Sequence, residues 1–299
     1  MTKSQAWIKA LRLRTLPLSL SGIIIGSAIA KFNGYWDWNI FLLSLLTTVL
    51  FQIVSNLAND LGDSVKGTDN KDRIGPMRSV QSGLISKNEM RNAVVITSIV
   101  SLLSAGNLIY IGTTNLPLSI LWFYIGLAVA CIFAAITYTI GKKAYGYYGL
   151  GDIMVFLFFG IVSVLGVYPL YAKSIDWLIL LPACSIGLLS AAVLNLNNMR
   201  DRTNDSKSGK NTLVVKIGHD WAKLYHTFLI LGGIICHVMF LVSINHTLAF
   251  IGLLPAIILI LHLQKVMKTK NPKDFDPELK KVALSTFGIA VLTAIGLMI

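Results

Sequence analysis

The sequence predicts an all-α membrane protein that crosses the bilayer nine times. The chain is 55% hydrophobic and 13% charged, and this charged fraction is about half of that in an ordinary soluble domain. Its apolar residues are gathered in runs of about 20, the length that an α-helix needs to span a bilayer. Its basic residues are almost absent from every second connection between these runs. Together these observations exclude a soluble globular domain.

Nine apolar segments have the length of a spanning helix. We expect them to form one transmembrane domain over residues 1–299, rather than several folding units. The predicted spans are residues 15–31, 39–58, 92–112, 117–138, 152–172, 177–196, 222–243, 247–264 and 282–299.

The distribution of basic residues predicts how the chain is oriented. Of the 26 lysines and arginines, all but Lys31 and Lys173 fall in the N-terminal segment or in the second, fourth, sixth and eighth connections. Lysine and arginine are enriched in cytoplasmic loops. The N-terminus is therefore expected in the cytoplasm and the C-terminus on the opposite side.

The cytoplasmic connections differ in length and composition. Residues of about 59–91 and 197–221 form long polar connections, and long loops tend to carry function. The fourth connection, about 139–151, faces the same side. The eighth, about 265–281, is also polar, but it holds mostly lysines. We interpret this eighth connection as solvated or lipid-facing charge.

Two acidic motifs lie at matching places, at the cytoplasmic ends of the second and sixth spans. Helical spacing puts the members of each motif on one face of its helix. Their carboxylate and amide oxygens are hard ligands that suit Mg²⁺, which binds through one or two carboxylates plus substrate phosphates. Two facing helices of this kind predict a Mg²⁺-dependent diphosphate site. The candidate metal ligands are Asn56, Asp60, Asp63, Asn197, Asp201 and Asp205.

Basic residues flank both motifs. They are expected to contact phosphate oxygens or the carboxylate of a second substrate. Those after the first motif are Lys66, Arg73 and Arg78, and those around the second are Arg200, Lys207 and Lys210.

Two other interpretations remain for the motifs. They could be ordinary solvated charges, or the ion sites of a transporter. A transporter places its binding site near the middle of the membrane. Here the acids lie at the membrane edge, all on one side, and the spans hold almost no acids near mid-depth. This placement favours an enzyme.

The motifs resemble those of the UbiA superfamily of intramembrane prenyltransferases, over most of the chain. Within it they are most similar to the members that prenylate 1,4-dihydroxy-2-naphthoate on the route to menaquinone. One departure is Gly67, which stands where the superfamily commonly has a third aspartate, so Asp69 or Asp72 would take that place. The matching stretches are RTLP at 14–17, NLANDLGDSVKGTD at 56–69, DRIGPMR at 72–78, GLIS at 83–86, YT at 138–139, GLGD at 149–152 and NNMRD at 197–201 with Asp205.

The resemblance implies a UbiA-type bundle and a reaction. A polyprenyl diphosphate would ionise with Mg²⁺, and an aromatic ring would attack the carbocation with loss of CO₂ and diphosphate. The product would be demethylmenaquinol or its quinone. Other acceptors in the superfamily remain open, among them 4-hydroxybenzoate, homogentisate and haem. The setting would be the cytoplasmic (inner) membrane of a bacterium, with the site on the cytoplasmic side.

The resemblance also implies roles for individual residues. The four motif aspartates would be catalytic, and Arg73, Arg78, Lys142, Arg200 and Lys210 would contact phosphate. Tyr138 would stabilise the carbocation, whereas we interpret the tyrosines at 145, 147 and 148 as interfacial anchors. From its charge and position alone, and not from the resemblance, we expect Arg14 to meet the acceptor carboxylate or a lipid headgroup. Asp152 would orient a lysine or handle a proton, or simply favour a helix N-terminus.

Overall fold

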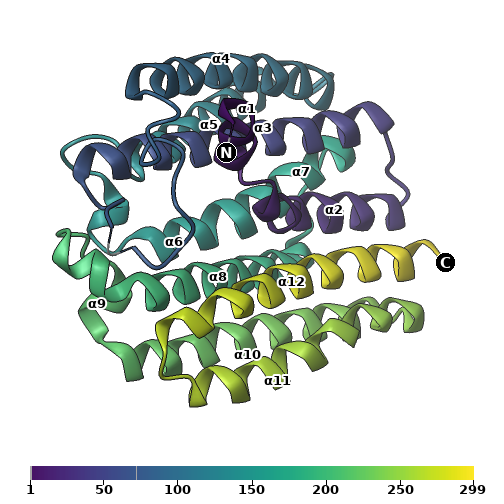
Figure 1. Ribbon diagram of the computed structural model, residues 1–299. Helices are drawn as coiled ribbons and strands as arrows, with labels where there is room; N and C mark the ends of the chain where they lie inside the picture. Colours follow the sequence, from purple (N-terminus) through teal and green to yellow (C-terminus); the bar gives the residue numbers. More distant parts are fainter. Residues whose placement is uncertain (1, 72) are drawn as a thin grey trace.

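The computed structural model describes residues 2–71 and 73–299, and those residues contain helices and connections but no strand (Figure 1). Within this described part, nine helices are long and apolar enough to cross a membrane, which confirms the predicted span number. They are Lys3–Phe32, Trp38–Lys66, Lys87–Gly112, Leu118–Thr137, Gly151–Ala172, Trp177–Lys207, His219–Ile244, Thr247–Lys268 and Pro272–Met298.

Several of these spans are built from more than one helical piece. The α-helices are α1 (Lys3–Leu11), α2 (Leu16–Phe32), α3 (Trp38–Lys66), α4 (Lys87–Gly112), α5 (Leu118–Thr137), α6 (Gly151–Val155), α7 (Ser163–Ala172), α8 (Leu180–Lys207), α9 (Leu213–Ile217), α10 (His219–Ile244), α11 (Leu254–Lys268) and α12 (Phe275–Met298). A π-helical segment, Phe156–Val162, joins α6 to α7. Short 3₁₀ turns lie at Leu13–Thr15, Tyr145–Tyr147, Trp177–Ile179, Thr247–Leu253 and Pro272–Asp274.

The long helices run roughly parallel to one another (Figure 1). The connection between α3 and α4, the short helix α9 and the connection between α11 and α12 lie at one end of the bundle, and the C-terminus lies at the other. Helix α2 packs on α7 and α12, and α8 packs on α10, α12 and the π-helical segment. Both acidic motifs therefore reach the same end of the bundle.

The second and sixth helices continue beyond the predicted ends of their spans. We expected ends at residues 58 and 196, but α3 runs to Lys66 and α8 to Lys207. Both acidic motifs are thus helical, because their side chains are buried among partners instead of standing in a loop. Helix α3 ends where Gly67 adopts a left-handed φ of 75°. This conformation costs a glycine little.

The two long polar connections are shorter than the sequence predicted. The stretch at about 59–91 reduces to residues 67–86, and a capping box at Ser86 and Glu89 starts α4. The stretch at about 197–221 reduces to residues 208–218, with α9 inside it. The two polar connections are therefore short enough to be held against the helix ends, and they cover them.

The π-helical segment packs against α8 at glycines. A methyl group added at Gly160 would lie 2.4 Å from the carbonyl oxygen of Ala183 and 2.6 Å from the Cα of Gly187. Both are backbone atoms, so no side chain can move aside. A π-helical insertion also shifts the direction of the side chains around it, and Phe158 and Phe159 line the central cavity described below.

We predict that Gly160→Ala lowers the melting temperature of the detergent-solubilised protein. The added methyl must push α8 away, and overpacking of this kind costs about 1–3 kcal/mol. Gly126→Ala is the matched control, since no atom lies within 4 Å of a methyl group added there. Equal melting temperatures for Gly160→Ala and Gly126→Ala would contradict the close contact.

Candidate active site

A cavity of about 550 Å³ opens among the ends of α3 and α8 and continues into the bundle. One end is polar. The other is apolar and is lined by α4, α5, the π-helical segment and α7. The polar lining includes Asn59, Asp63, Asn197, Asp201, Asp205 and Lys210. The apolar lining includes Leu108, Leu127, Phe158, Phe159, Val162 and Leu170.

In the first motif the three predicted ligands face different ways. Asp63 lines the cavity. Asp60 does not, because its carboxylate accepts hydrogen bonds from the backbone N–H groups of Ser79 at 3.1 Å and Val80 at 3.4 Å. The amide of Asn56 lines the cavity and donates to the carbonyl oxygen of Leu11 at 2.9 Å. The structure thus places Asp60 as the anchor of the 67–86 connection.

The second motif is organised by the buried guanidinium of Arg200. Its Nε and Nη2 donate to the two carboxylate oxygens of Asp201 at 3.0 and 2.7 Å. Nη2 also donates to Asn197 at 2.8 Å, and Nη1 donates to Asp276 of α12 at 2.5 Å. Arg200 was expected to contact phosphate. Instead its donors are used by the motif itself and by α12.

Asp205 contributes a carboxylate that the protein leaves available. It lines the cavity, and its side chain forms no hydrogen bond or ion pair with another described residue. The positive charge of Lys210 acts on Asp205. The Nζ of Lys210 faces Asp63 and lies 3.5 Å from both of its carboxylate oxygens. Asp63 and Asp205 therefore present oxygen atoms toward the same space as the Asp201 carboxylate.

Tyr147 supports Asp63 from the fourth connection. Its hydroxyl donates to Asp63 Oδ1 at 2.7 Å and lies 2.6 Å from the hydroxyl of Thr68. The ammonium group of Lys66 lies 3.9 Å from the centre of the same ring. Burial and the Asp63 charge raise the pKa of Tyr147, so the phenol stays protonated and donates. Interpreting Tyr147 as an interfacial anchor was wrong, since the ring is buried within the site.

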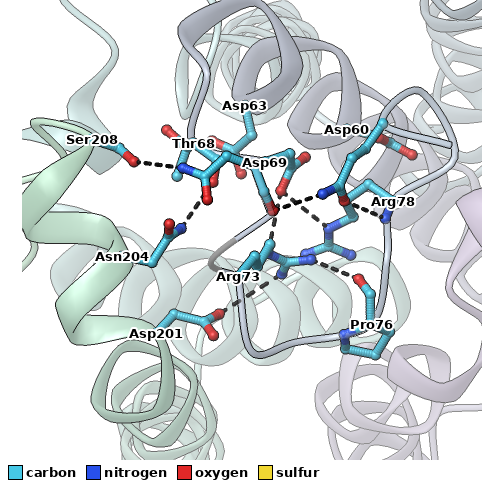
Figure 2. A network of polar contacts seen from close by, with 12 residues as sticks. Asp60, Asp63, Thr68, Asp69, Arg73, Pro76, Arg78, Asp201, Asn204 and Ser208 are labelled. Atoms are coloured by element: carbon cyan, nitrogen blue, oxygen red, sulfur yellow. Dashed lines mark hydrogen bonds and ion pairs between the residues drawn. The ribbon is translucent and has the colours of Figure 1, made fainter. Parts of the chain in front are cut away.

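The 67–86 connection carries an ion-pair cluster beside the aspartates of both motifs (Figure 2). Asp69 lies between two arginines, with its Oδ1 3.2 Å from Nε of Arg73 and 3.9 Å from Nε of Arg78. Burial, together with the negative charge of Asp63, raises the pKa of Asp69 to about 6. Arg73 also reaches Asp201 of α8, 3.7 Å away. Asp69 therefore organises arginines, and Asp72 lies outside the described residues.

This connection is tied to α8 at two further points. The side-chain amide of Asn204 donates to the carbonyl oxygen of Thr68 at 2.9 Å (Figure 2). A methyl group added at Gly75 would lie 2.8 Å from Nη2 of Arg200 and 3.1 Å from Nη2 of Arg73. A side chain at this position would require the Arg200 guanidinium to shift. The two motifs are thus joined through the segment that follows the first of them.

The predicted basic residues divide into two groups. Arg14, Arg73, Arg78, Arg200 and Lys210 line the cavity. Lys66, Lys142 and Lys207 do not, and the last two are exposed. The prediction that Lys142 contacts phosphate therefore has no support in this arrangement.

Tyr138 and Tyr145 line the cavity with their rings edge to face, 5.3 Å apart between centroids. The Tyr145 hydroxyl donates to the carbonyl oxygen of Ala134 at 2.9 Å. Asp152 is buried in the first turn of α6 and does not line the cavity. The two aromatic rings, and not Asp152, are therefore in a position to meet a ligand.

Four residues of the site were missed from the sequence. Asp276 belongs to the eighth connection, which we interpreted as solvated charge; that interpretation was wrong here, because Asp276 pairs with Arg200 and Lys280 lines the cavity. Asn59 and Arg12 also line the cavity. For Asn59 a signal existed, since it adjoins Asp60 in the acidic motif.

The donor set fits Mg²⁺ better than a metal that needs a complete protein cage. Within the described residues, no three His, Cys, Asp or Glu side chains form a ready metal-binding group. Asp63, Asp201 and Asp205 nevertheless supply hard oxygen donors around one cavity. Mg²⁺ keeps several waters and is completed by substrate phosphates, so such an open set suits it.

The structure is an all-helical membrane bundle whose cavity joins an acidic and basic end to an apolar branch. These features define the class of intramembrane proteins for molecules with an anionic head and a long apolar tail. Residues 19–285 match the UbiA prenyltransferase family. The chain belongs to that family.

Known relatives agree with this assignment over the full chain. It is 41% identical over 300 residues to a 1,4-dihydroxy-2-naphthoate octaprenyltransferase of Escherichia coli (strain K12), covering 100% of this chain and 97% of the relative. An apo structure of a UbiA homologue from Aeropyrum pernix K1 superposes with a TM-score of 0.70 at 15% identity, covering 96% and 98%. A homologue from Archaeoglobus fulgidus bound to DMAPP and Mg²⁺ gives 0.61 at 15% identity, covering 94% and 98%. These structures confirm the UbiA fold.

We predict that Tyr147→Phe weakens Mg²⁺ binding. Loss of the hydroxyl removes a hydrogen bond to a carboxylate, worth about 1.5–3 kcal/mol, and should raise the Mg²⁺ concentration at half-saturation about 10- to 100-fold. The measurement is a Mg²⁺ titration of the melting temperature with inorganic diphosphate present. Tyr148→Phe is the control, because that ring is 54% exposed. An unchanged titration for Tyr147→Phe would show that this hydrogen bond does not contribute to Mg²⁺ binding.

Proposed function

We propose that this protein transfers a polyprenyl chain from polyprenyl diphosphate to 1,4-dihydroxy-2-naphthoate, releasing CO₂ and diphosphate and giving demethylmenaquinol. The observation that carries the proposal is the cavity itself, which joins four aspartates and several basic side chains to an apolar branch. A diphosphate on a long hydrocarbon chain has these two halves. The full-length similarity to 1,4-dihydroxy-2-naphthoate octaprenyltransferases supports the choice of acceptor.

In this proposal the acids of both motifs hold the diphosphate end through Mg²⁺. Asp63, Asp201 and Asp205 are the residues that would bind it, with Asn197 beside them. When bound, Mg²⁺ neutralises the charge that develops on the diphosphate as its bond to carbon breaks. Arg73, Arg78 and Lys210 supply further positive charge from the protein. Arg200, which also lines the cavity, keeps the second motif in place through Asn197 and Asp201.

The bond changes balance without an added proton donor or redox partner. The allylic C–O bond breaks, and its electron pair leaves with diphosphate. The electron-rich ring carbon that bears the carboxylate then forms a bond to the terminal carbon of the cation. The bond to the carboxylate breaks next, its electron pair restores the aromatic ring, and CO₂ departs.

The surroundings of the cavity protect the cation. The rings of Tyr138 and Tyr145 lie along the polar part. Aromatic faces stabilise cations. The 67–86 connection is bound to α8 and contributes Thr68, Arg73 and Arg78 to the cavity lining. The apolar branch receives the hydrocarbon chain.

A direct assay tests the reaction. Purified protein with Mg²⁺ and radiolabelled octaprenyl diphosphate should transfer label to 1,4-dihydroxy-2-naphthoate with release of CO₂. Transfer to 4-hydroxybenzoate or homogentisate should be absent. Asp201→Asn should reduce the rate by at least about 100-fold, because a charged group at the developing leaving group is lost. Transfer only to another aromatic would reject the proposed acceptor, and transfer to none would reject the function.

We further propose that the site faces the cytoplasm, in the cytoplasmic (inner) membrane of a bacterium, with the N-terminus on the same side. The asymmetry of lysine and arginine supports this orientation. Alkaline phosphatase fused after Ile299 should be active and a fluorescent protein fused there dark, as expected outside the cytoplasm. Fusions after Asn271, in the connection between α11 and α12, should give the opposite pattern. The same pattern at both positions would contradict the orientation.

A further inference from the structure

Arg12 enters the cavity from the turn between α1 and α2. Its backbone is left-handed, with φ 50°, and this conformation reverses the chain before α2 begins. The turn is anchored to α3, since the side-chain amide of Asn56 donates to the carbonyl oxygen of Leu11. The Thr15 hydroxyl closes the turn by donating to the Arg12 carbonyl oxygen at 2.8 Å. The position of Arg12 is therefore set by the same helix that carries the first acidic motif.

The guanidinium of Arg12 is a cation without a partner in the described chain. Its Nη2 is buried, and the side chain forms no hydrogen bond or ion pair with the described residues. The acids whose charges act on it most strongly are Asp60 and Asp63. Asp60 is already bound by two backbone amides, and Asp63 is bound by Tyr147 and Lys210. A buried charge without a counter-charge is costly, so this position is suited to an anion from outside the protein.

The other cavity-lining cations differ from Arg12. Arg73 and Arg78 share Asp69, Arg200 holds Asp201, and Lys210 faces Asp63. Arg14 and Lys280 line the cavity but are exposed. Among the described cavity-lining cations that are buried or half-buried, Arg12 is thus the one that lacks an acidic partner.

The anchor of Arg12 lies deeper in the bundle than the acids. Asn56 precedes Asp63 by seven residues on α3, which is about 10 Å along the helix axis. Since α3 ends at Lys66, Asn56 lies farther than Asp63 from the end of the helix that carries the acidic motif. The charges of Asp60, Arg73 and Asp63 act on Arg12, so an anion that Arg12 holds would lie next to the diphosphate site.

We propose that Arg12 binds the carboxylate of the aromatic acceptor and selects acceptors that carry one. This inference rests on the proposed function. The attacked carbon bears the carboxylate, so that group must lie beside the allylic carbon, next to the phosphates but outside their site. A guanidinium can hold both carboxylate oxygens at once through its planar fork. The assignment replaces Arg14, two residues along, which is exposed.

The test compares two inhibitors that differ only in the carboxylate. 1-Hydroxy-2-naphthoate and 1-naphthol compete with the acceptor in the transfer assay, and the ratio of their inhibition constants measures the preference for the carboxylate. The wild-type protein should prefer 1-hydroxy-2-naphthoate. In Arg12→Gln this preference should fall about 10- to 100-fold, the value of a hydrogen-bonded charge. The KM for polyprenyl diphosphate should change far less.

Two further variants make the test specific. Arg12→Lys keeps the positive charge but loses the planar guanidinium, so it should retain part of the preference for the carboxylate. It also replaces Arg12→Gln in the test if that variant does not fold. Lys9→Gln is the control, because Lys9 is an exposed basic residue of α1 outside the cavity lining, and its preference should equal that of the wild type.

The outcomes separate this inference from the proposed function. Without wild-type transfer to 1,4-dihydroxy-2-naphthoate, the function itself fails. If the wild type transfers and prefers the carboxylate while Arg12→Gln keeps that preference, Arg12 is not its partner. Loss of the preference in Arg14→Gln instead would move the role to Arg14. A raised KM for polyprenyl diphosphate in Arg12→Gln, with the preference intact, would assign Arg12 to the diphosphate and overturn the proposal.

Discussion

The buried guanidinium of Arg200 is the interaction on which the rest of the site depends. Its donors join Asn197 and Asp201 of α8 to Asp276 of α12. Carboxylates that gather in a membrane bundle repel one another and lose hydration, and a charge-assisted hydrogen bond offsets both effects. By occupying Asp201 from one side, Arg200 leaves the cavity side to a ligand. It also fixes the start of α12, which is why that helix contributes to the wall of the cavity.

A second constraint concerns the basic residues of the site, which must lie among the acids without neutralising all of them. The 67–86 connection meets this need. It is held at one end by Asp60, which binds the amides of Ser79 and Val80, and at the other by the Asn204 amide. Between these points Asp69 keeps Arg73 and Arg78 together (Figure 2). Asp60, which was expected to bind metal, thus helps to hold the segment that brings Arg73 and Arg78 to the site.

The bundle also separates two environments within one cavity. The polar end depends on hydrogen bonds such as that from Tyr147 to Asp63. The apolar branch depends on close helix contacts, among them Gly160 against α8. These contacts shape a branch that remains apolar beside a highly charged mouth. The combination of the two explains how a protein can act on the head of a lipid while its tail remains in a hydrocarbon-like environment.

The sequence by itself determined the nine spans, the matching ends of the acidic motifs and the family, since apolar length and motif spacing are local properties of the chain. It also indicated most of the basic residues that line the cavity. Only the tertiary structure decided that Asp60 faces a connection, that Tyr147 supports Asp63, and that Asp276 reaches Arg200. These roles arise from segments distant in the chain, and the choice of partner for a polar side chain depends on which backbone or charge is brought within hydrogen-bonding distance.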